Sequence, residues 1–436
     1  MALRRITTLF LAAFVAASAL APASSAAVAP PQTGFEKTDG AAWTTHEEEL
    51  EFLAEVDAMS ERLSVSVIGK TKEGRPLHLV KLGNPAPHAR ATAHGQPTIL
   101  YVCSQHGNEP AGREACLKLL RDLAFTDDPE LLQQLGGNTI LFVPSANPDG
   151  RAANTRENSS GVDINRDHLN LTTPESRAIA KVVRDWRPEV SIDLHEYGPS
   201  IPAFYDDEVL YLWPRNLNAD QLVRDMAKHL AHDFIEKDAE DSGYTADEYG
   251  QYAAGDQDVH QSAGDGDEGI MRNTMGLRHS LGILVETAVT QDPRNGPDEA
   301  SDEAAVNRRR VDSHMVVSHA ALRFLREEGQ AALFTTDRAF MRKLKEGRKR
   351  SAPVYFDGAD NQEPTTVQDP PPCAYSLTAK QRKQVAKTMR LLGIAGRRSG
   401  KRYMVHMGQP AEPLIPLLLD ERGLRHSVAA KPQSKC

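Results

Sequence analysis

Cysteine is scarce in this sequence. Its 436 residues include four cysteines, too few for a small disulfide-stapled scaffold. In an oxidising compartment four cysteines allow three pairings, and the sequence does not choose among them. A buried free thiol is the alternative for Cys103, which stands in an apolar run. The four residues are Cys103, Cys116, Cys373 and Cys436.

An excess of basic charge is also absent. The chain has 51 Lys and Arg residues against 60 Asp and Glu residues, a formal net charge of −9. A generic nucleic-acid binder relies on clustered Lys and Arg to neutralise phosphates, so we expect no nucleic-acid partner. Hydrophobic residues make up 40% and charged residues 25%, which excludes disordered, collagen-like and multi-span membrane proteins. The length fits two or three domains, or one large α/β domain with attachments.

The first residues have the layout of a cleaved secretory signal. Arg4 and Arg5 precede an apolar run from Leu9 to Leu20, and small residues follow at 23–27. The run is shorter than the ~20 residues that a membrane-spanning helix needs, so we expect residues 1–26 to be removed rather than to anchor the protein. Loss of the two arginines changes the net charge from −9 to −11. We therefore expect an acidic, secreted or periplasmic protein without a stable membrane span after cleavage.

Short apolar runs alternate with longer amphipathic stretches between Pro97 and Gly296. The pattern predicts an α/β fold with a mixed, mostly parallel central sheet flanked by helices, followed by a small C-terminal extension. In such sheets, sites form at the carboxyl ends of the strands. The expected strands are Thr98–Cys103, Thr139–Pro144, Val190–Leu194 and Leu281–Glu286. The expected helices are Gly112–Phe125, Pro174–Trp186, Asn216–Ile235 and Ala304–Glu328.

Residues 238–269 are rich in Asp, Gly, Tyr and Ala and poor in large aliphatic side chains. We expect a long mobile loop there, either a solvated acidic loop or one that covers a substrate. The basic stretch 338–350 is expected to be a solvated helix face, with an anionic partner as the alternative.

Three potential metal ligands follow two of the expected strands. The strand that ends at Cys103 is followed by His106 and Glu109 on a tight loop, and His195 ends another buried strand. Zinc binds imidazole nitrogen and carboxylate oxygen, and a His2Glu set leaves one position open for water, as in hydrolytic sites. His106 and Glu109 alone are a weak signal, because a surface histidine and a glutamate at a helix start explain them equally well.

Other charged side chains would complete such a site. An arginine such as Arg156 can stabilise an oxyanion, and a second one such as Arg166 can bind a substrate carboxylate through two hydrogen bonds. Glu286 ends the last apolar strand at the same sheet edge, where a carboxylate suits a general base for a metal-bound water. Asp193 precedes His195 on the same strand face and has either an orienting or a structural role.

This ordered series resembles the zinc metallocarboxypeptidase family typified by carboxypeptidase A. Each motif is weak alone, and the whole series is much more specific. The resemblance begins with residues 48–63 and the segment Ile68–Leu77, and covers residues 40–325. A segment from Arg272 to Arg278 is similar to a bacterial secreted subgroup. The residues that carry the resemblance are His106, Glu109, Asn147–Gly150, Arg156, Asn165, Arg166, Asp193, His195 and Glu286.

The resemblance implies one zinc ion per chain, held by His106, Glu109 and His195. Glu286 would be the general base that takes a proton from the zinc-activated water, and later the proton donor. The implied activity is hydrolysis of C-terminal peptide bonds. The other implied roles are oxyanion stabilisation by Arg156 and binding of the terminal carboxylate by Asn165 and Arg166.

Two features depart from the digestive enzymes of the family. The tyrosine that closes over substrate in those enzymes cannot be assigned, because Tyr244, Tyr249 and Tyr252 all lie in the acidic segment. Arg278, shortly before the last strand, is expected to add a second positive contact to substrate, with a surface salt bridge as the alternative.

The sequence thus predicts a zinc carboxypeptidase-like catalytic domain over residues 40–330 and a C-terminal extension over 331–436. The expected partner is a peptide or peptide-like substrate with a free carboxylate. An alternative on the same scaffold is a zinc-dependent N-acyl amino acid deacylase, or an amidase or peptidase of murein stem peptides. A catalytically silent zinc- or peptide-binding module is a third hypothesis.

Overall fold

The computed structural model describes residues 29–83, 86, 95–198, 207–252, 259–260, 265–290 and 302–436. The chain from Pro31 to Cys436 is one compact unit. The expected signal segment, residues 1–26, lies outside the described residues. No helix within the described ranges is both long and apolar enough to cross a bilayer.

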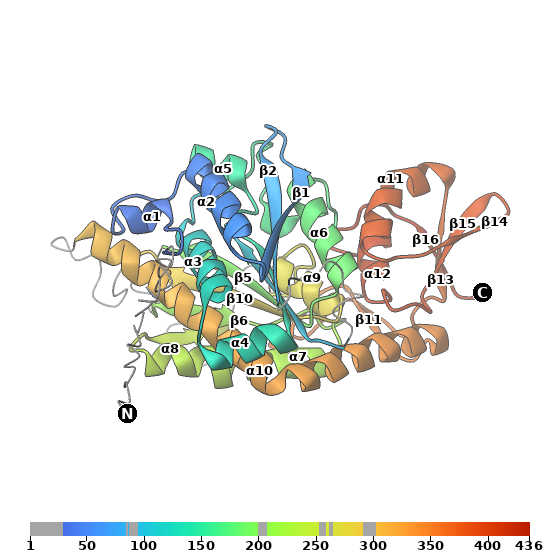
Figure 1. Cartoon of the computed structure of the whole chain (residues 1–436). Coiled ribbons are helices and arrows are strands. Elements are labelled where there is room, and N and C mark those ends of the chain that lie inside the picture. The colour runs from blue at the N-terminus through green and yellow to red at the C-terminus, as the bar shows by residue number, and fades with distance from the viewer. Residues whose placement is uncertain are drawn as a thin grey trace, which may run out of the picture. The chain divides into compact units, whose positions relative to one another are not determined.

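A mixed eight-stranded sheet forms the centre of this unit (Figure 1). Its order is β1-β2-β4-β3-β5-β10-β6-β7. The inner strands β4, β3, β5 and β10 are parallel, as are β6 and β7, whereas β1–β2, β2–β4 and β10–β6 pair antiparallel. The strands are β1 (Leu63–Lys70), β2 (Pro76–Leu82), β3 (Thr98–Cys103), β4 (Thr139–Val143), β5 (Val190–Tyr197), β6 (Val209–Leu212), β7 (Ala246–Glu248) and β10 (Leu281–Ala288).

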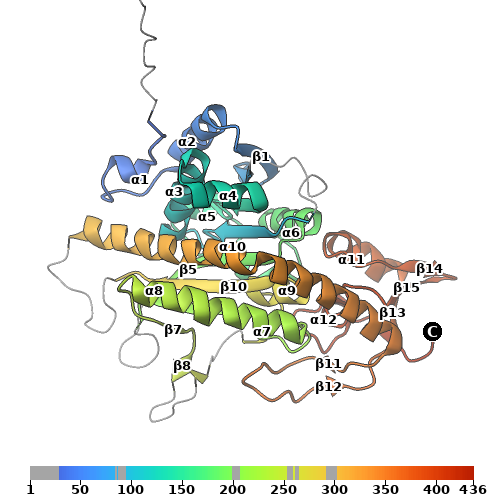
Figure 2. The same cartoon turned by 60° about the horizontal axis from the view of Figure 1, so that its bottom comes forward.

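Successive side chains of the central strands face opposite sides of the sheet, and helices cover both sides. On β3, Ile99 and Tyr101 pack into the larger core with α2 (His46–Met59), α3 (Ala111–Phe125), α7 (Gln221–Leu230) and α10 (Glu303–Lys349). Leu100 and Val102 pack on the other face with α6 (Pro174–Trp186) and α9 (Met271–Leu277). Figure 2 shows α7 and α10 side by side.

Local sequence explains where several helices begin. Thr45 and Glu48 form a reciprocal capping box at the start of α2, which satisfies backbone N–H groups of its first turn. Pro174 occupies the first turn of α6 after the capping residue Thr173. The other helices of the body are α1 (Gly34–Lys37), α4 (Pro129–Gly137), α5 (Pro148–Ala153), the 3-10 turn Ile164–Arg166, the π-helical segment Ala231–Glu236 and α8 (Lys237–Asp241).

The expected fold class is confirmed, with differences in individual elements. The helix expected over 216–235 begins at Gln221, because the Asp220 carboxylate accepts a hydrogen bond from the Leu222 N–H and caps it there. The range 238–269 is not one long loop, since it contains most of α8, the edge strand β7 and the short strands β8 (Gln251–Tyr252) and β9 (Val259–His260). Its residues 253–258 and 261–264 lie outside the described part of the chain.

Helix α10 connects the body to the last part of the chain. It passes residue 330, the expected domain boundary, without interruption. Beyond it the chain forms the antiparallel sheet β14-β15-β13-β16, which lies near the end of α10 in Figure 2. The elements there are β11 (Val354–Tyr355), β12 (Val367–Gln368), β13 (Ala374–Leu377), α11 (Ala379–Leu391), β14 (Arg397–Ser399), β15 (Arg402–His406), α12 (Leu414–Leu419) and β16 (Lys431–Gln433).

One apolar cluster is shared between the C-terminal residues and the body. Leu417 and Leu418 of α12 belong to the same buried cluster as Leu169, Leu171 and Leu277 of the body. Burial of α12 against the body removes apolar surface of both from water. The two parts therefore stabilise each other.

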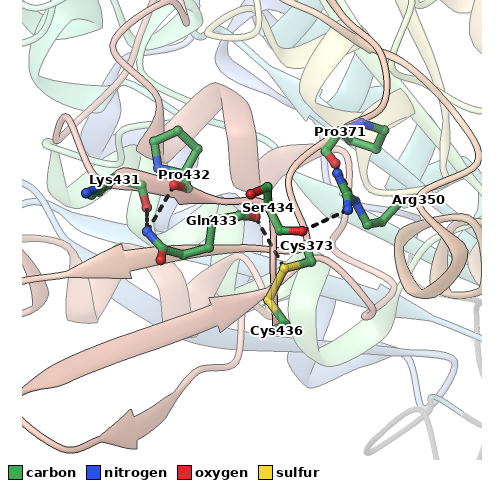
Figure 3. The surroundings of a disulfide bond; sticks show 8 residues. All are labelled: Arg350, Pro371, Cys373, Lys431, Pro432, Gln433, Ser434 and Cys436. Atoms are coloured by element: carbon green, nitrogen blue, oxygen red, sulfur yellow. Dashed lines mark hydrogen bonds between the residues drawn. A yellow bond between two sulfur atoms is a disulfide. The ribbon is translucent and has the colours of Figure 1, made fainter.

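All four cysteines are paired. Cys103 at the end of β3 is bonded to Cys116 in α3, and Cys373 is bonded to Cys436. Figure 3 shows the second bond, beside which the Arg350 guanidinium donates hydrogen bonds to the carbonyls of Pro371 (2.7 Å) and Ser434 (2.9 Å). These contacts connect the end of α10 to the chain terminus.

The shared cluster predicts cooperative unfolding of the body and the C-terminal residues. Leu418→Ala should lower the free energy of unfolding by about 2–5 kcal/mol, because Leu418 is fully buried in that cluster. Leu424→Ala, at a leucine that is 66% exposed, should change it by less than about 0.5 kcal/mol. Urea unfolding followed by far-ultraviolet circular dichroism measures both. A separate early transition that alone responds to Leu418→Ala would contradict this coupling.

Candidate metal and active site

The loop after β3 carries His106 and Glu109 to the carboxyl edge of the sheet. Gly107 lies so close to α5 that a β-carbon there would stand 1.9 Å from the Gly150 carbonyl carbon, so the approach requires glycine. Asn147 accepts a hydrogen bond from the Gly150 N–H (2.9 Å) and donates one to the Gln105 carbonyl (3.1 Å). The Asn147–Gly150 turn therefore holds the loop in place.

Strand β5 brings His195 to the same edge. Ile192 and Leu194 point into the larger core, so Asp193 and His195, which alternate with them, point to the other face of the sheet. In the parallel pairing of β5 with β10, His195 lies opposite Glu286. The register of two buried strands thus places a histidine next to a carboxylate.

His106, Glu109 and His195 converge on one point. The Nδ1 atoms of the two imidazoles are 3.0 Å apart, and the Glu109 carboxylate lies 2.7 Å from Nδ1 of His106 and 2.8 Å from Nδ1 of His195. All three side chains are buried, and one ligand atom from each lies within 4.8 Å of the others. Such a group of two nitrogen donors and one oxygen donor could hold a metal ion.

Two further carboxylates lie behind the imidazoles. His106 Nε2 is 3.1 Å from Oδ1 of Asp163, and His195 Nε2 is 2.9 Å from Oδ2 of Asp193. A proton on each Nε2 would be donated to these carboxylates, which leaves the Nδ1 lone pairs directed at the shared point. This carboxylate–histidine pairing is typical of metal-ligating histidines.

The charges around the imidazoles favour a cation. Burial opposes a charged His106, but the carboxylates of Glu109 and Asp163 raise its pKa above the ordinary value. Burial likewise opposes a charged His195, and Asp193 and Glu109 raise its pKa well above the ordinary value. The cluster therefore attracts positive charge, and its donors fit zinc.

Glu286 is buried beside this cluster. Burial raises its pKa to about 7, although the positive charge of His195 opposes the shift. Its Oε2 atom is buried and has no hydrogen-bond partner within the described residues. A buried carboxylate oxygen without a partner fits a contact with water or substrate.

Arg156 lies next to the converging ligands. Its guanidinium donates to Oδ2 of Asp163 from Nη2 (2.9 Å) and from Nε (3.2 Å), and Nη1 is 3.6 Å from Oε1 of Glu109. Burial alone would raise the pKa of Asp163, but its hydrogen bond with His106 and the charges of His106 and Arg156 hold that pKa well below its usual range. Asp163 thus orients both an imidazole and a guanidinium.

Asn165 and Arg166 stand on the short 3-10 turn beside the cluster. Asn165 Nδ2 donates to Oδ2 of Asp193 (3.1 Å), and its Oδ1 accepts from the Met271 N–H (2.8 Å). Nη1 of the half-buried Arg166 donates to the Asn165 carbonyl (2.9 Å). Asn165 Nδ2 also lies 2.8 Å from His195 Nε2, so Asn165 contacts both His195 and its partner Asp193.

A C-terminal residue supports the loop that precedes Met271. The Arg425 guanidinium forms an ion pair with Asp267 (2.5 Å), and the Arg425 N–H donates to Oε1 of Glu268 (2.9 Å). These contacts connect the C-terminal residues to the loop before Met271. The Met271 N–H in turn donates a hydrogen bond to Asn165.

Arg278 is not part of this cluster. Its guanidinium lies 3.3 Å from the carbonyls of Ala180 in α6 and Leu391 in α11. Arg278 follows α9 and precedes β10, whereas Glu286 stands near the carboxyl end of β10. Arg278 therefore lies at the opposite edge of the sheet, where the body meets the C-terminal residues. The position of Arg278 therefore does not support the expectation that it adds a second positive contact to substrate.

The three candidate tyrosines have different surroundings. Tyr244 is buried, and the Arg309 guanidinium lies 4.4 Å from its ring centre. The Tyr249 N–H donates to the Tyr211 carbonyl (2.9 Å), and the side chain of Tyr252 lies outside the description. None of these contacts identifies a tyrosine that closes over substrate.

Sequence reasoning assigned no role to Asp163, Gln105 and His168. Gln105 donates to Oδ1 of Asp193 (2.7 Å) and accepts a hydrogen bond from His168 (2.6 Å), whose pKa burial lowers to about 4. The position of Asp163, two residues before Asn165 and three before Arg166, was the one signal available. An aspartate at this position could equally be the N-cap of a short helix, and Asp163 does cap the turn Ile164–Arg166.

Comparisons with known proteins agree on one family. The zinc carboxypeptidase family model matches residues 49–268, which include six of the eight candidate site residues but not Arg278 and Glu286. Carboxypeptidase 2 of Trichophyton rubrum is 28% identical over 263 residues, covering 57% of this chain and 48% of the relative. Carboxypeptidase SOL1 of Arabidopsis thaliana is 36% identical over 141 residues, covering 29% of this chain and 28% of the relative.

A solved structure has the same fold. A Shewanella denitrificans protein assigned as a carboxypeptidase A gives a TM-score of 0.51 at 20% identity, over 64% of this chain and 70% of that chain. The chain spans about half the length of the fungal relatives it matches. Because the family model matches half of the residues of this chain, the chain belongs to the zinc carboxypeptidase family.

Proposed function

We propose that this protein is a zinc-dependent metallocarboxypeptidase that hydrolyses C-terminal peptide bonds. The observation that carries the proposal is the convergence of His106, Glu109 and His195 beside Glu286, whose buried Oε2 has no partner within the described residues. A metal-binding group next to a buried carboxylate is the arrangement that metal-assisted hydrolysis requires.

His106, Glu109 and His195 would hold one zinc ion. When bound, zinc supplies Lewis-acid polarisation of a carbonyl and lowers the pKa of water. Asp163 and Asp193 would keep each imidazole in the tautomer with a free Nδ1, because each accepts a hydrogen bond from an Nε2–H.

Glu286 and Arg156 would act on the scissile bond. The raised pKa of Glu286 suits it to accept a proton from the attacking water and to return it to the leaving amine. Arg156 would stabilise the negative charge that develops on the scissile carbonyl oxygen. Its contact with Asp163 supports this role, since it holds the guanidinium beside the ligand group.

Asn165 and Arg166 would bind the carboxylate of the substrate's last residue. An arginine can form two parallel hydrogen bonds with a carboxylate, and the half-buried Arg166 lies on the turn next to the ligand cluster. Such a contact would restrict cleavage to the last peptide bond. We further propose that residues 1–26 direct export, so that the enzyme acts outside the cytoplasm.

The carboxylate contact predicts a preference for free peptide ends. Zinc-loaded protein should release the last residue of a peptide with a free carboxyl terminus and leave its C-terminally amidated twin uncut. Arg166→Met should raise KM for the free peptide by at least about tenfold, because it loses a charge-assisted contact. Mass spectrometry of the products measures both. Cleavage of an N-acyl amino acid or a murein stem peptide, with neither peptide cut, would favour the deacylase or murein alternative.

Glu286→Gln should lower kcat by about 10²–10⁴-fold with zinc retained, because an amide cannot accept the proton. Zinc content by atomic absorption separates this effect from metal loss. Glu55→Gln, at an exposed position on α2, is the matched control and should leave kcat unchanged. Undiminished turnover by Glu286→Gln would overturn the assigned base.

Asp163→Asn should weaken zinc binding by about 10–100-fold, because the partner of His106 Nε2 loses its charge. Competition with a chromogenic chelator gives the zinc dissociation constant, and circular dichroism verifies the fold. Asp185→Asn, at an exposed residue of α6, is the control. Equal zinc affinity in both variants would mean that Asp163 acts in another way.

A further inference from the structure

A cavity lies between the body and the C-terminal residues. It has a volume of about 240 Å³. Its walls come from the end of α6 with residues 187–189, the end of α9 with residues 278–280, the last third of α10, and C-terminal residues 392–393, 410–411 and 414. The cavity is therefore built jointly by residues before and after position 330.

The cavity is remote from the candidate active site. Glu189 and Ser280 line it, and each immediately precedes a strand, β5 or β10. His195 and Glu286 stand near the other ends of the same strands, six residues further along each. At about 3.3 Å per residue the two sites are about 20 Å apart, at opposite edges of the sheet.

Three arginines and one carboxylate, that of Glu189, line the cavity. Arg184 is paired with Asp185 (2.7 Å) and Arg187 with Asp337 (3.4 Å), so Arg278 is the lining arginine whose charge is available to a ligand. The Glu189 carboxylate accepts a hydrogen bond from the Thr98 N–H (2.6 Å). Within the described residues no ion pair involves the Arg278 guanidinium, whose hydrogen-bond partners are two carbonyls at 3.3 Å. Burial and the charge of Arg184 lower the pKa of Arg278 to about 10, so it is still charged at neutral pH.

The other walls are apolar and well supported. Leu277, Leu392 and Leu414 are buried side chains of the lining. The ring of Phe340 lies between Arg187, whose guanidinium is 4.5 Å from the ring centre, and His279, whose ring centre is 5.9 Å away. His279 is itself fixed by a hydrogen bond to the Pro410 carbonyl (2.9 Å).

Size and charge together define a class of ligand. A dry cavity of about 150 Å³ lined by apolar side chains can bind benzene, so this larger one has room for an aromatic ring or a short alkyl chain. A half-buried guanidinium without an acidic partner favours an anion, and its planar fork matches a carboxylate. Inorganic phosphate would leave the apolar walls without a contact.

We propose that this cavity is a binding site for a small amphipathic carboxylate, whose carboxylate pairs with Arg278 and whose apolar part packs against Leu277, Leu392, Leu414 and Phe340. This site is independent of the proposed peptidase activity. Because C-terminal residues form part of its wall, its ligand would also stabilise their contact with the body.

The probe for the test is 3-phenylpropionate, with the neutral 3-phenylpropionamide as its matched partner. Isothermal titration of the zinc-loaded full chain should show binding of the acid, and binding of the amide at least tenfold weaker. Arg278→Met removes the charge and keeps the length of the side chain. Ala411→Trp fills the cavity and keeps the charge. Both should weaken binding of the acid by at least tenfold, whereas Arg338→Met, at an exposed arginine on α10, should not.

Under the proposed function Arg166 also binds a carboxylate, so the titrations are repeated in Arg166→Met. Binding that survives Arg166→Met and is lost on adding Arg278→Met or Ala411→Trp supports the proposal. Three outcomes overturn it: no binding of the acid at millimolar concentration, equal binding of acid and amide, or binding that depends on Arg166 alone. If Arg278→Met fails to fold by circular dichroism, Ala411→Trp decides the test. Inorganic phosphate is a further arm, and binding of phosphate as tight as that of the acid would also overturn the proposed class.

Discussion

The central constraint on this structure is the convergence of two imidazoles and a carboxylate at one buried point. The Nδ1 atoms of His106 and His195 lie 3.0 Å apart. In the tautomers with a proton on each Nε2, two Nδ1 lone pairs face each other at this distance and repel. The surrounding parts keep this arrangement in place. Gly107 permits the close contact with α5, and Asp163 and Asp193 hold the far side of each ring. A cation that lies between these atoms would replace repulsion with attraction.

The site depends on connections that are distant in sequence. Asp193 receives hydrogen bonds from Gln105 after β3 and from Asn165 on the 3-10 turn, so one carboxylate joins three segments of the chain. Asn165 in turn accepts from Met271, and the loop before Met271 is held by Arg425 near the chain terminus. The C-terminal residues thus contribute to the support of the site as well as to a shared apolar cluster. A disturbance of their packing would reach Asn165 through this loop.

Much of the fold and the candidate site could be predicted from local patterns. The apolar runs of β3, β4, β5 and β10 can be read from the sequence, because strands buried on both faces are continuously apolar. The zinc carboxypeptidase family could be named from the order of its motifs. The role of Asp163 could not be predicted, since a carboxylate that caps a turn and one that orients an imidazole look the same in sequence. Arg278 was expected at the site on the family resemblance, although a residue that precedes a parallel strand lies at the sheet edge opposite to the carboxyl end of that strand.

By itself the sequence determined which residue types follow which strands, and therefore which side chains reach the carboxyl edge of the sheet, because strand periodicity and apolar runs are local properties. Tertiary structure alone decided the register that sets Glu286 beside His195, the disulfide pairing, and the position of Arg278 in a cavity at the opposite edge. Those features depend on contacts between segments that are far apart along the chain. Their energies come from packing and desolvation in the folded molecule, which no local pattern encodes.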